Sequence, residues 1–377
     1  KKRYFRLLAM KKNLIIFYPS FEKGGVTNIL KNLIKSKNKE QFKIHIISSD
    51  QFLKNIRSSK KFIFYSVRKN ITIPFFPQRY NTALNGMFLL FSLISKLKTN
   101  IVIHSMQSNV AAIIISILKR KKIIIRNSEN PIYSTLNSEN YFFGIFTFFL
   151  KFLFYNFADG IITNSKGSAQ SLKYFVFNKK KIKYIYNPHL NKINKKKFKK
   201  FNYIINIARL RKQKDHKTLL EAFHIFSRQN KKYKLLILGH GNLEYKLKLQ
   251  CKKLGILDKV IFKGWVKNTE TYLKKSKIFV LSSVYEGLGN VLIDAINFNI
   301  PCISTNCPSG PGEILLNGKG GYLTLVKSPL QLADKMTYSI KNYSESLKKN
   351  SFAKKSLDRF LISNQSKKYF DYLYKFN

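Results

Sequence analysis

Cysteine and histidine are scarce in this chain, whose 377 residues include three cysteines and six histidines. Cys251, Cys302 and Cys307 have no spacing typical of metal ligands and are too few for a disulfide framework. The histidines form no His-x-x-x-His cluster, and no Asp-x-Asp pair occurs in the sequence. We therefore expect free thiols in a cytoplasmic protein, no metal site, and no metal or other cofactor.

Acidic residues are also few, with 18 Asp and Glu against 70 Lys and Arg and a formal net charge of +52. Such an excess favours binding to polyanions, so a nucleic-acid-binding protein is one interpretation. The lysines are spread along the whole chain among many Asn, Ile, Phe and Tyr residues, which favours a general compositional bias instead. Under either interpretation the surface should attract anionic lipid, by about 1 kcal/mol per well-placed cation.

No uncharged apolar run reaches the roughly 18 to 20 residues of a membrane-spanning helix. The nearest candidate, residues 141–157, is rich in aromatic residues and is interrupted by Lys151. It fits a helix in a membrane interface and, equally well, a helix of the core. The basic residues 1–9 precede Met10, which could be the true start, and show no signal peptide. We expect a cytoplasmic protein that is peripheral to the inner face of the cytoplasmic membrane.

Short apolar runs alternate with helical patterns along the chain, which predicts parallel sheets covered by helices. The charged residues 192–202 interrupt this pattern and indicate a linker. The predicted organisation is an N-terminal domain over 11–191, a C-terminal domain over 203–349 and a helical segment over 350–377. Strands are expected at 14–18, 43–47, 101–104, 122–125, 160–163, 182–186, 203–207, 234–238, 260–262, 278–281 and 302–304. Helices are expected between them at 26–34, 83–97, 110–118, 217–227 and 243–254.

Residues 282–294 form the most informative stretch. It follows an apolar run and passes through two glycines into a helical pattern that begins at Asn290. This order predicts backbone N–H groups gathered at a helix N-terminus, where phosphate binds readily. Glu286 and Asp294 bracket the site in a chain that has few acids. Phosphate held by backbone beside carboxylates suits a nucleotide sugar, and an ordinary helix cap with loop glycines is the plain alternative.

Three further strand ends belong to the same predicted sheet, and parallel strands bring their carboxyl ends to one edge. The first loop carries an Arg and a Lys, which bind phosphate as a planar fork and as a mobile point charge. The second carries two glycines that permit close approach of a ligand. The third carries a Trp that could form a wall against a flat base, although a lone Trp is as often core. These residues are Arg209 and Lys214, Gly239 and Gly241, and Trp265 and Val266.

At these motifs the chain resembles the GT-B glycosyltransferases of family 4, a retaining group that uses nucleotide sugars. The similarity runs from Asn13 to the C-terminus and is strongest over residues 208–321. It implies an α/β fold with two Rossmann-like doubly wound domains facing a cleft, and a C-terminal helix that can return to the N-terminal domain. The segments that match the family as they stand are Arg209-Leu210, Gln213-Lys214, Gly239-His240-Gly241 and Glu286.

The chain departs from the family in two places. Asp294 stands where the family carries a second Glu, which keeps the charge but shortens the reach by one methylene. Gly312 stands where bacterial members that build surface polysaccharides usually carry a basic residue. Residues 320–323 match the family and are predicted to form a structural turn. Asp159 and Ser165 are expected to be structural, with Ser165 capping a helix.

The resemblance also implies roles in the first half of the chain. Gly24 and Gly25 correspond to the glycine loop near the donor phosphates, His104 lies where a family member often has a His near the sugar, and Arg126 could touch the acceptor. The residues themselves leave alternatives open. Two adjacent glycines are a weak signal, a strand-end histidine is as often packed or solvent-facing, and a turn fixed by Pro131 explains the segment after Arg126 equally well.

The implied reaction moves a hexosyl or N-acetylhexosaminyl group from a nucleoside diphosphate, with UDP expected, to a glycan or lipid-linked glycan in cell-surface polysaccharide synthesis. The anomeric configuration is retained. Without a metal, Arg209, Lys214 and backbone N–H groups would neutralise the leaving diphosphate. Glu286 would hold sugar hydroxyls and Asp294 would accept a hydrogen bond from the ribose. The backbone expected to face the donor belongs to Gly287, Leu288, Gly289, Asn290 and Val291.

Two other classes of protein remain as alternatives. A nucleotide-sugar epimerase could use the same two-domain scaffold and would need no acceptor. A basic nucleic-acid-binding protein is suggested by charge alone, since the sequence shows no recognisable binding module.

Overall fold

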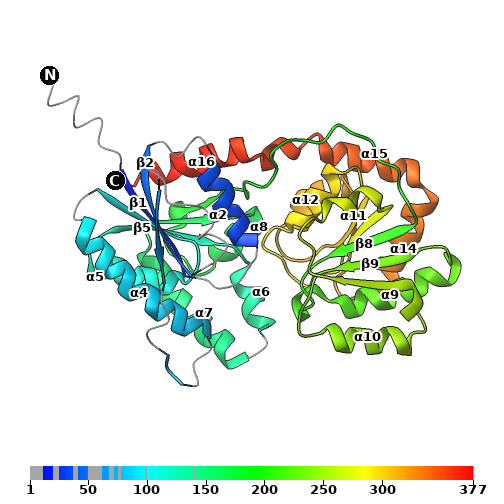
Figure 1. The fold of residues 1–377 in the computed structure, drawn as a ribbon, viewed down its shortest axis with the longest axis horizontal. Coiled ribbons are helices and arrows are strands. Elements are labelled where there is room, and N and C mark those ends of the chain that lie inside the picture. Colours follow the sequence, from blue (N-terminus) through cyan, green and yellow to red (C-terminus); the bar gives the residue numbers. More distant parts are fainter. Residues whose placement is uncertain are drawn as a thin grey trace.

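The chain folds around two parallel β-sheets that lie side by side (Figure 1). A computed structural model describes residues 12–19, 25–36, 41–49, 62–67, 72–74, 78–97, 100–138 and 141–376. The first sheet has seven strands in the order β3-β2-β1-β4-β5-β6-β7, and the second has six in the order β10-β9-β8-β11-β12-β13. Every described strand pair is parallel.

The first sheet is covered by helices on both faces, because its strands are apolar on both sides. Side chains of Leu14 and Ile16 join one buried cluster, and those of Ile15 and Phe17 join the cluster on the opposite face. The strands are β1 (Lys12–Tyr18), β2 (Phe42–Ser48), β3 (Phe62–Ser66), β4 (Ile101–Ser105), β5 (Lys122–Asn127), β6 (Gly160–Thr163) and β7 (Ile182–Tyr184). The helices are α2 (Gly25–Lys35), α4 (Gln78–Leu97), α5 (Asn109–Leu118), α6 (Pro131–Leu136), α7 (Tyr141–Phe154) and α8 (Lys166–Leu172).

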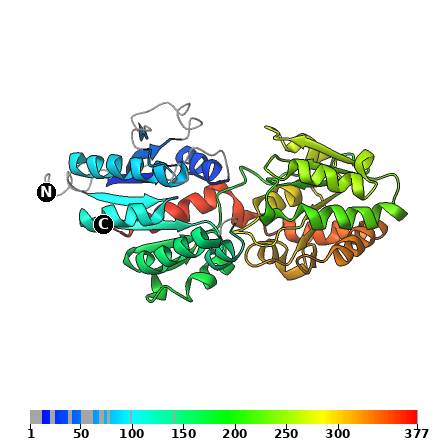
Figure 2. The ribbon, with the colours of Figure 1, turned by 90° about the horizontal axis from the view of Figure 1, so that it is seen from below.

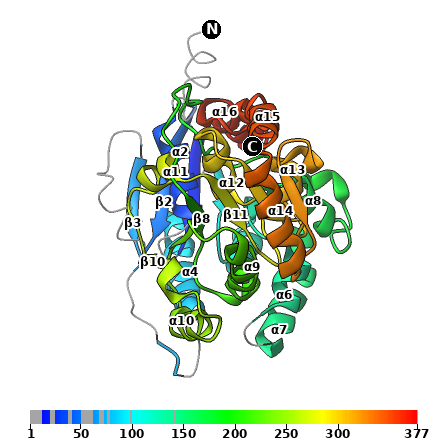
Figure 3. The ribbon, with the colours of Figure 1, turned by 90° about the vertical axis from the view of Figure 1, so that its right-hand side faces the viewer.

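The second sheet follows the same plan, with Ile204 and Ile205 on opposite faces of β8. Its strands are β8 (Tyr203–Ile207), β9 (Lys234–Leu238), β10 (Val260–Gly264), β11 (Ile278–Leu281), β12 (Cys302–Thr305) and β13 (Tyr322–Thr324). Its helices are α9 (His216–Gln229), α10 (Glu244–Lys253), α11 (Glu270–Lys275), α12 (Asn290–Asn297), α13 (Pro311–Ile314), α14 (Pro329–Lys341) and α15 (Tyr343–Lys354). Figure 3 faces this half of the molecule and shows α9 and α14 side by side.

The C-terminus returns to the first sheet. Leu190 and Leu361 form a parallel bridge where the outgoing and returning chain segments meet. Helix α16 (Ile362–Tyr374) then packs Tyr369, Phe370 and Leu373 into the core beside α2, as the red helix in Figures 1 and 2 shows. The predicted α/β fold with two doubly wound units is confirmed, and so is the return of the C-terminal helix.

Two edge strands were not expected from the sequence. Strand β3 is short and follows a charged, Ser-rich stretch. Residues 320–323, predicted to be a turn, run into strand β13, whose Tyr322 pairs with Ile303 of β12. The glycines there favour a turn locally, and pairing with the neighbouring strand overrides that preference.

The predicted helix cap at Ser165 is confirmed, because the Ser165 side chain accepts a hydrogen bond from the Ser168 N–H at 3.1 Å.

The domain boundaries remain a prediction. Residues 192–202 connect the two sheets without forming a helix or strand, and α15 runs across the expected boundary at 349/350. The three cysteines are free, as expected, and all three are buried. Burial raises the pKa of the Cys251 thiol to about 11, so this thiol stays protonated at neutral pH.

Candidate functional site

The strand orders place a crevice in each half of the molecule. In the first sheet β1 lies beside β4, and in the second β8 lies beside β11. On the two sides of each pair, the order of the strands proceeds in opposite directions. Ligands of such sheets bind at this reversal point, beyond the carboxyl ends of the strands. A cavity of about 390 Å³ lies there and is lined by both halves of the chain.

Most of the predicted site residues line this one cavity. The two from the first half are a glycine at the start of α2 and an arginine at the end of β5. All four predicted loops of the second half contribute. The residues are Gly25, Arg126, Arg209, Lys214, Gly239, Trp265, Val266, Glu286, Gly287, Leu288, Gly289, Asn290 and Val291. Gly24 lies outside the described residues, and the cavity lining does not include Gly241, His104 or Asp294.

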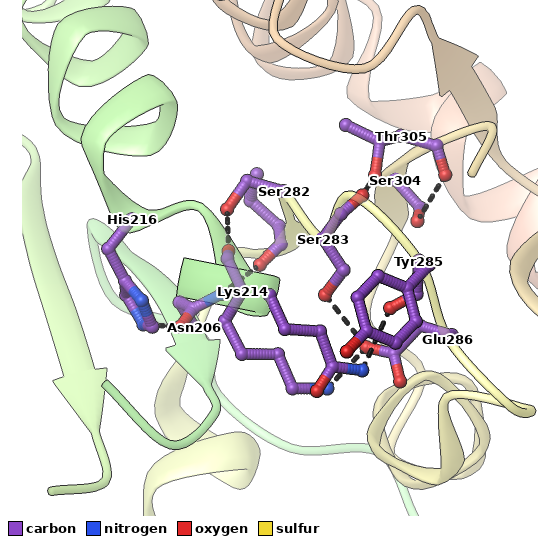
Figure 4. Close-up of polar contacts among 11 residues, drawn as sticks. Asn206, Lys214, His216, Ser282, Ser283, Tyr285, Glu286, Ser304 and Thr305 are labelled. Atoms are coloured by element: carbon purple, nitrogen blue, oxygen red, sulfur yellow. Dashed lines mark hydrogen bonds and ion pairs between the residues drawn. The ribbon is translucent and has the colours of Figure 1, made fainter. Parts of the chain in front are cut away.

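Lys214 and Glu286, which both line the cavity, form an ion pair (Figure 4). Their Nζ and Oε1 atoms are 2.5 Å apart, and the side chains are 17% and 8% exposed. The Ser283 hydroxyl also donates to Oε1 of Glu286, at 2.7 Å. Because an ammonium has three donors, the contact with Glu286 uses one of them. The pair therefore places a cation and a carboxylate next to each other, both largely withdrawn from water.

The loop that carries Lys214 is tied to the loop that carries Glu286. Gln213 donates from Nε2 to the Tyr285 carbonyl at 2.9 Å and accepts at its own carbonyl from the Val284 N–H at 2.9 Å. The Ser282 hydroxyl donates to the Lys214 carbonyl at 2.8 Å. These three bonds hold the loops after β8 and β11 as one unit, so the charges are positioned before any ligand arrives.

A buried polar layer supports this unit from below. His216 donates from Nε2 to Oδ1 of Asn206 at 3.0 Å, and the Asn206 amide donates to the Val280 carbonyl at 2.8 Å. Burial, together with the charge of Lys214, lowers the pKa of His216 to about 4. His216 is therefore neutral near pH 7 and adds no charge beneath the site.

Helix α12 points its N-terminus at the cavity. Its cap, Gly289, has φ 87°, in the left-handed region that favours glycine. The first N–H groups of a helix have no partner within the helix and carry its positive dipole end, so they suit an anion. In the same loop a Cβ on Gly287 would lie 1.9 Å from the Ser128 carbonyl oxygen of the first half. Only glycine lets these two loops approach so closely.

Gly239 and Gly241 shape the adjoining wall in different ways. Gly239 lines the cavity at φ 140°, where a Cβ would meet the Ala208 carbonyl oxygen at 2.0 Å. A Cβ on Gly241 would meet the Leu210 carbonyl oxygen at 2.3 Å, so this glycine serves loop packing. Trp265 lines the cavity and is 55% exposed, which excludes the core alternative for this side chain.

His104 does not lie where the family resemblance implies. Its side chain is fully buried, donates from Nδ1 to the Ile124 carbonyl at 3.0 Å, and accepts at Nε2 from the Tyr369 hydroxyl at 2.8 Å. Burial and the charge of Arg126 lower its pKa to about 3, against the opposing effect of the Ile124 bond. The expected catalytic role of His104 is therefore corrected: it is a neutral histidine that joins β4 to the returning helix α16.

Asp294 is held by a partner that the sequence did not indicate. Its Oδ1 lies 2.7 Å from Nε2 of His189, on the segment that leaves the first sheet. Burial lowers the pKa of His189, but the charge and hydrogen bond of Asp294 outweigh that effect and raise it overall. The shorter Asp side chain is thus directed at the connecting segment, and it does not line the cavity.

Arg126 lies between this cavity and a second one of about 470 Å³, and it lines both. It donates to Ser128 and, at 2.5 Å, to Oδ1 of Asn187, while its buried Nε has no partner in the described part of the chain. None of the ion pairs among described residues involves it. A buried guanidinium without a carboxylate favours an anionic ligand beside it.

Asn187 is a site residue that the sequence analysis missed. Its amide donates to Oδ1 of Asn290 at 2.8 Å while its oxygen accepts from Arg126, so it links the first half of the site to α12. Asn187 lies in an irregular segment before Pro188, and no local pattern marks it. The other polar residues of the cavity lining that were not predicted as site residues are Ser128, Glu129, Asn164, Gln213 and Thr269.

The described residues contain no group of three or more His, Cys, Asp or Glu side chains arranged to hold a metal ion. No helix among them combines the length and the apolar character needed to cross a bilayer.

The GT-B glycosyltransferases have two doubly wound units around a cleft. Here that cleft presents cations and a helix N-terminus. Residues 23–189 match the family model described as Glycosyltransferase Family 4, and residues 190–356 match the model described as Glycosyl transferases group 1. With both halves matched in this order, the chain belongs to the GT-B glycosyltransferases of family 4.

Curated relatives agree with this assignment. An uncharacterised glycosyltransferase of Methanocaldococcus jannaschii is 32% identical over 253 residues, which cover 62% of each chain. The N-acetylgalactosamine-N,N'-diacetylbacillosaminyl-diphospho-undecaprenol 4-alpha-N-acetylgalactosaminyltransferase of Campylobacter jejuni is 32% identical over 213 residues, or 55% of this chain and 57% of the relative. The matches thus span about three-fifths of the length of these relatives.

Solved structures show the same fold at low identity. HepE of Anabaena, in complex with UDP-glucose, has a TM-score of 0.78 at 15% identity and covers 97% of this chain and 99% of its own. TarM of S. aureus has a TM-score of 0.76 at 14% identity, with the same coverage. At such identities the likeness concerns the fold.

Proposed function

We propose that this glycosyltransferase moves a hexosyl or N-acetylhexosaminyl group from a UDP-sugar to a lipid-linked glycan, with retention of configuration and without a metal. The observation that carries the proposal is the convergence of Arg209, Lys214 and the N-terminus of α12 on one cavity that also holds Glu286. That set combines anion binding with a carboxylate for hydroxyls.

In the proposed reaction the bond between the anomeric carbon and the diphosphate oxygen breaks early, so negative charge grows on the diphosphate. Lys214 and Arg209 would contact the phosphate oxygens, and the N–H groups at residues 289–291 would donate to them. These donors are held by loop bonds before the ligand binds, so little reorganisation is needed as charge develops. Glu286 would accept hydrogen bonds from sugar hydroxyls while its contact with Lys214 keeps it oriented.

The nucleotide base and the ribose fit the outer part of the same cavity. Trp265 and Val266 offer an apolar wall there, beside Gly239. We assign no ribose contact to Asp294, because His189 holds its carboxylate.

The acceptor fits the second cavity, which opens on the other side of Arg126. Among the described residues that line it, Arg126, Lys151, Arg209 and Arg211 are cationic and Glu129 is acidic. An excess of cations in the lining suits an acceptor that carries phosphate. The relative from Campylobacter jejuni named above has a diphospho-undecaprenol acceptor in its name, and we extend that class to this chain. A lipid acceptor also implies work at a membrane surface in surface-glycan synthesis.

A product assay tests the proposal. The purified chain is incubated with a panel of nucleotide sugars, with and without an undecaprenyl-diphosphate glycan, in the presence and absence of a chelator. We expect glycolipid product with a UDP-sugar, the same anomer as the donor, and no loss of rate with the chelator. An isomerised nucleotide sugar formed without acceptor would identify an epimerase instead.

A further inference from the structure

Helix α7 exposes most of an almost wholly apolar surface. Its sequence is YFFGIFTFFLKFLF, and apolar side chains occupy 11 of the positions other than Gly144. Even so, Gly144 is the only buried residue of this helix in the described structure. Phe142 is 87% exposed, and exposed side chains follow at helical spacing. This outward stripe consists of Phe142, Ile145, Phe146, Phe149, Phe152 and Leu153.

The inner side of α7 explains how the helix is held. Phe148 and Phe154 pack against the core of the first sheet. The Thr147 hydroxyl lies 3.1 Å from the Tyr80 hydroxyl of α4, whose ring lies against Phe143. The helix is therefore anchored on one side, and its exposed stripe is a second apolar face that the described residues leave largely uncovered.

Neighbouring elements extend this apolar face. Phe177 is 76% exposed and meets Phe152 edge to face, with ring centroids 6.2 Å apart. Helix α5, which packs beside α7, ends in the exposed Ile117 and Leu118. Exposed apolar side chains gathered over several elements mark an interaction surface rather than ordinary surface variation.

Cations lie on the elements next to α7. The Lys119 ammonium lies 3.5 Å from the ring centroid of Phe91 on α4, and Lys181 donates to the Asn156 carbonyl just beyond α7. Helix α7 itself carries no acid. Aromatic residues bordered by lysines, in a chain of net charge +52, complement a surface that is apolar inside and anionic outside.

The position of Lys151 relates this face to the proposed acceptor site. It lies on α7 and lines the second cavity together with Arg126. The exposed stripe and the cavity wall are therefore two sides of one helix, so a lipid-anchored acceptor held at the face would have its phosphate end close to the cavity.

We propose that the exposed face of α7, with the flanking lysines, docks on an anionic lipid bilayer and presents the second cavity to it. The link to the acceptor rests on the proposed function, whereas the docking itself does not. It is distinct from a spanning helix, because α7 lies along the surface of the first half and its inner face is packed.

Vesicle flotation with the full chain tests the docking. Vesicles are made of phosphatidylcholine alone, or of phosphatidylcholine with an equal amount of phosphatidylglycerol, and no sugar donor is added. We expect the chain to float with the anionic vesicles and to be released by high salt. The variant Phe146→Ser/Phe149→Ser should lose at least roughly tenfold in binding, because binding scales with the apolar area inserted.

Matched controls separate docking from misfolding. Tyr245→Ser/Phe352→Ser removes two exposed aromatic residues from the second half and should bind vesicles like the wild type. Thermal unfolding of both variants should match the wild type, because the altered side chains are exposed. Equal vesicle binding by the two variants, or wild-type protein that stays unbound, would overturn the proposal. So would a wild-type dimer in sedimentation that the Phe146→Ser/Phe149→Ser change dissociates, since the face would then bind a second copy.

The test of vesicle binding does not depend on turnover. If vesicle binding follows the α7 face but no donor yields glycolipid, the docking surface stands and the proposed function fails. If glycolipid forms in detergent but vesicles do not bind, the reverse holds.

Discussion

Lys214 contributes to the candidate site through both its side chain and its backbone. Its ammonium pairs with Glu286 at 2.5 Å while its backbone carbonyl accepts from Ser282. These two contacts fix the ammonium beside the carboxylate that we expect to hold the sugar. They are present without any ligand.

Lys214→Ala should lower kcat by about 100- to 1,000-fold, or roughly 3 to 4 kcal/mol, as for other preorganised donors to a developing negative charge. Initial rates of glycolipid formation measure this. The neighbouring Lys212, which is exposed on the same short turn, provides the control, and Lys212→Ala should keep near wild-type activity. Near wild-type turnover in a folded Lys214→Ala protein would remove Lys214 from the mechanism.

The His189–Asp294 pair makes a pH-dependent contribution to stability. Because the pKa of His189 is raised in the folded chain, the contribution is complete below the unfolded pKa of about 6.5. It is lost as pH rises through the higher folded pKa. The difference in unfolding free energy between the wild type and Asp294→Asn should therefore be largest in mild acid.

Urea unfolding of both proteins between about pH 5 and pH 8 measures that difference. A gap that stays constant over this range would show that His189 does not titrate with Asp294. Donor affinity should fall little in Asp294→Asn, because this carboxylate does not line the cavity. A large loss of affinity would instead restore the ribose contact that the family resemblance implies.

At the scale of elements, the approach of the α12 loop to the β5 loop determines the shape of the site. Gly287 lies where a Cβ would come within 1.9 Å of the Ser128 carbonyl oxygen. Gly287→Ala should force the two loops apart and weaken donor binding by roughly tenfold or more, about 1.4 kcal/mol. Calorimetric titration with the donor measures the change.

Gly255→Ala is the control for the Gly287→Ala variant. Gly255 has φ +65° and no atom within 4 Å of a built Cβ, and it lies outside the cavity lining. Gly255→Ala should cost about 1 to 2 kcal/mol of stability through its left-handed backbone and leave donor affinity unchanged. If both variants bound the donor equally well, the closeness of the two loops would not matter for binding.

The second half of the site was predictable because its signals are local. The loops that contain Arg209, Lys214 and Glu286 each follow an apolar strand, and parallel strands end at one edge of a sheet. His104 was assigned wrongly because a strand-end position does not reveal what packs above it. Its partner, Tyr369, is 265 residues away in the sequence.

At the scale of the whole molecule, helix α16 makes the N-terminal half dependent on the last residues of the chain. Phe370 is buried in the core of the first sheet and meets Phe42 of β2, with ring centroids 6.0 Å apart. Tyr369 from the same helix hydrogen-bonds His104 and lies within electrostatic range of Arg126. The returning helix thus supports the sheet and the buried arginine together.

Phe370→Ala should cost about 3 to 5 kcal/mol, the range for removing a buried aromatic ring. Hydrogen exchange should speed up in β1 and β2 and change little in β8 and β9, because the lost contacts belong to the first sheet. Lys368→Ala, an exposed change on the same helix, should leave exchange unaltered. Unchanged protection in β1 and β2 would show that α16 is dispensable for the first sheet.

The sequence by itself determined the alternation of strands and helices, the two doubly wound units and the loops of the second half that meet at one cavity. Periodicity and strand-end chemistry are local, so they can be read along the chain. Only the tertiary structure decided that His104 is a core residue, that His189 holds Asp294, that Asn187 joins Arg126 to α12, and that α7 turns an apolar face outward. Each of these depends on which distant segment packs against which, and no pattern within a single stretch of sequence encodes that pairing.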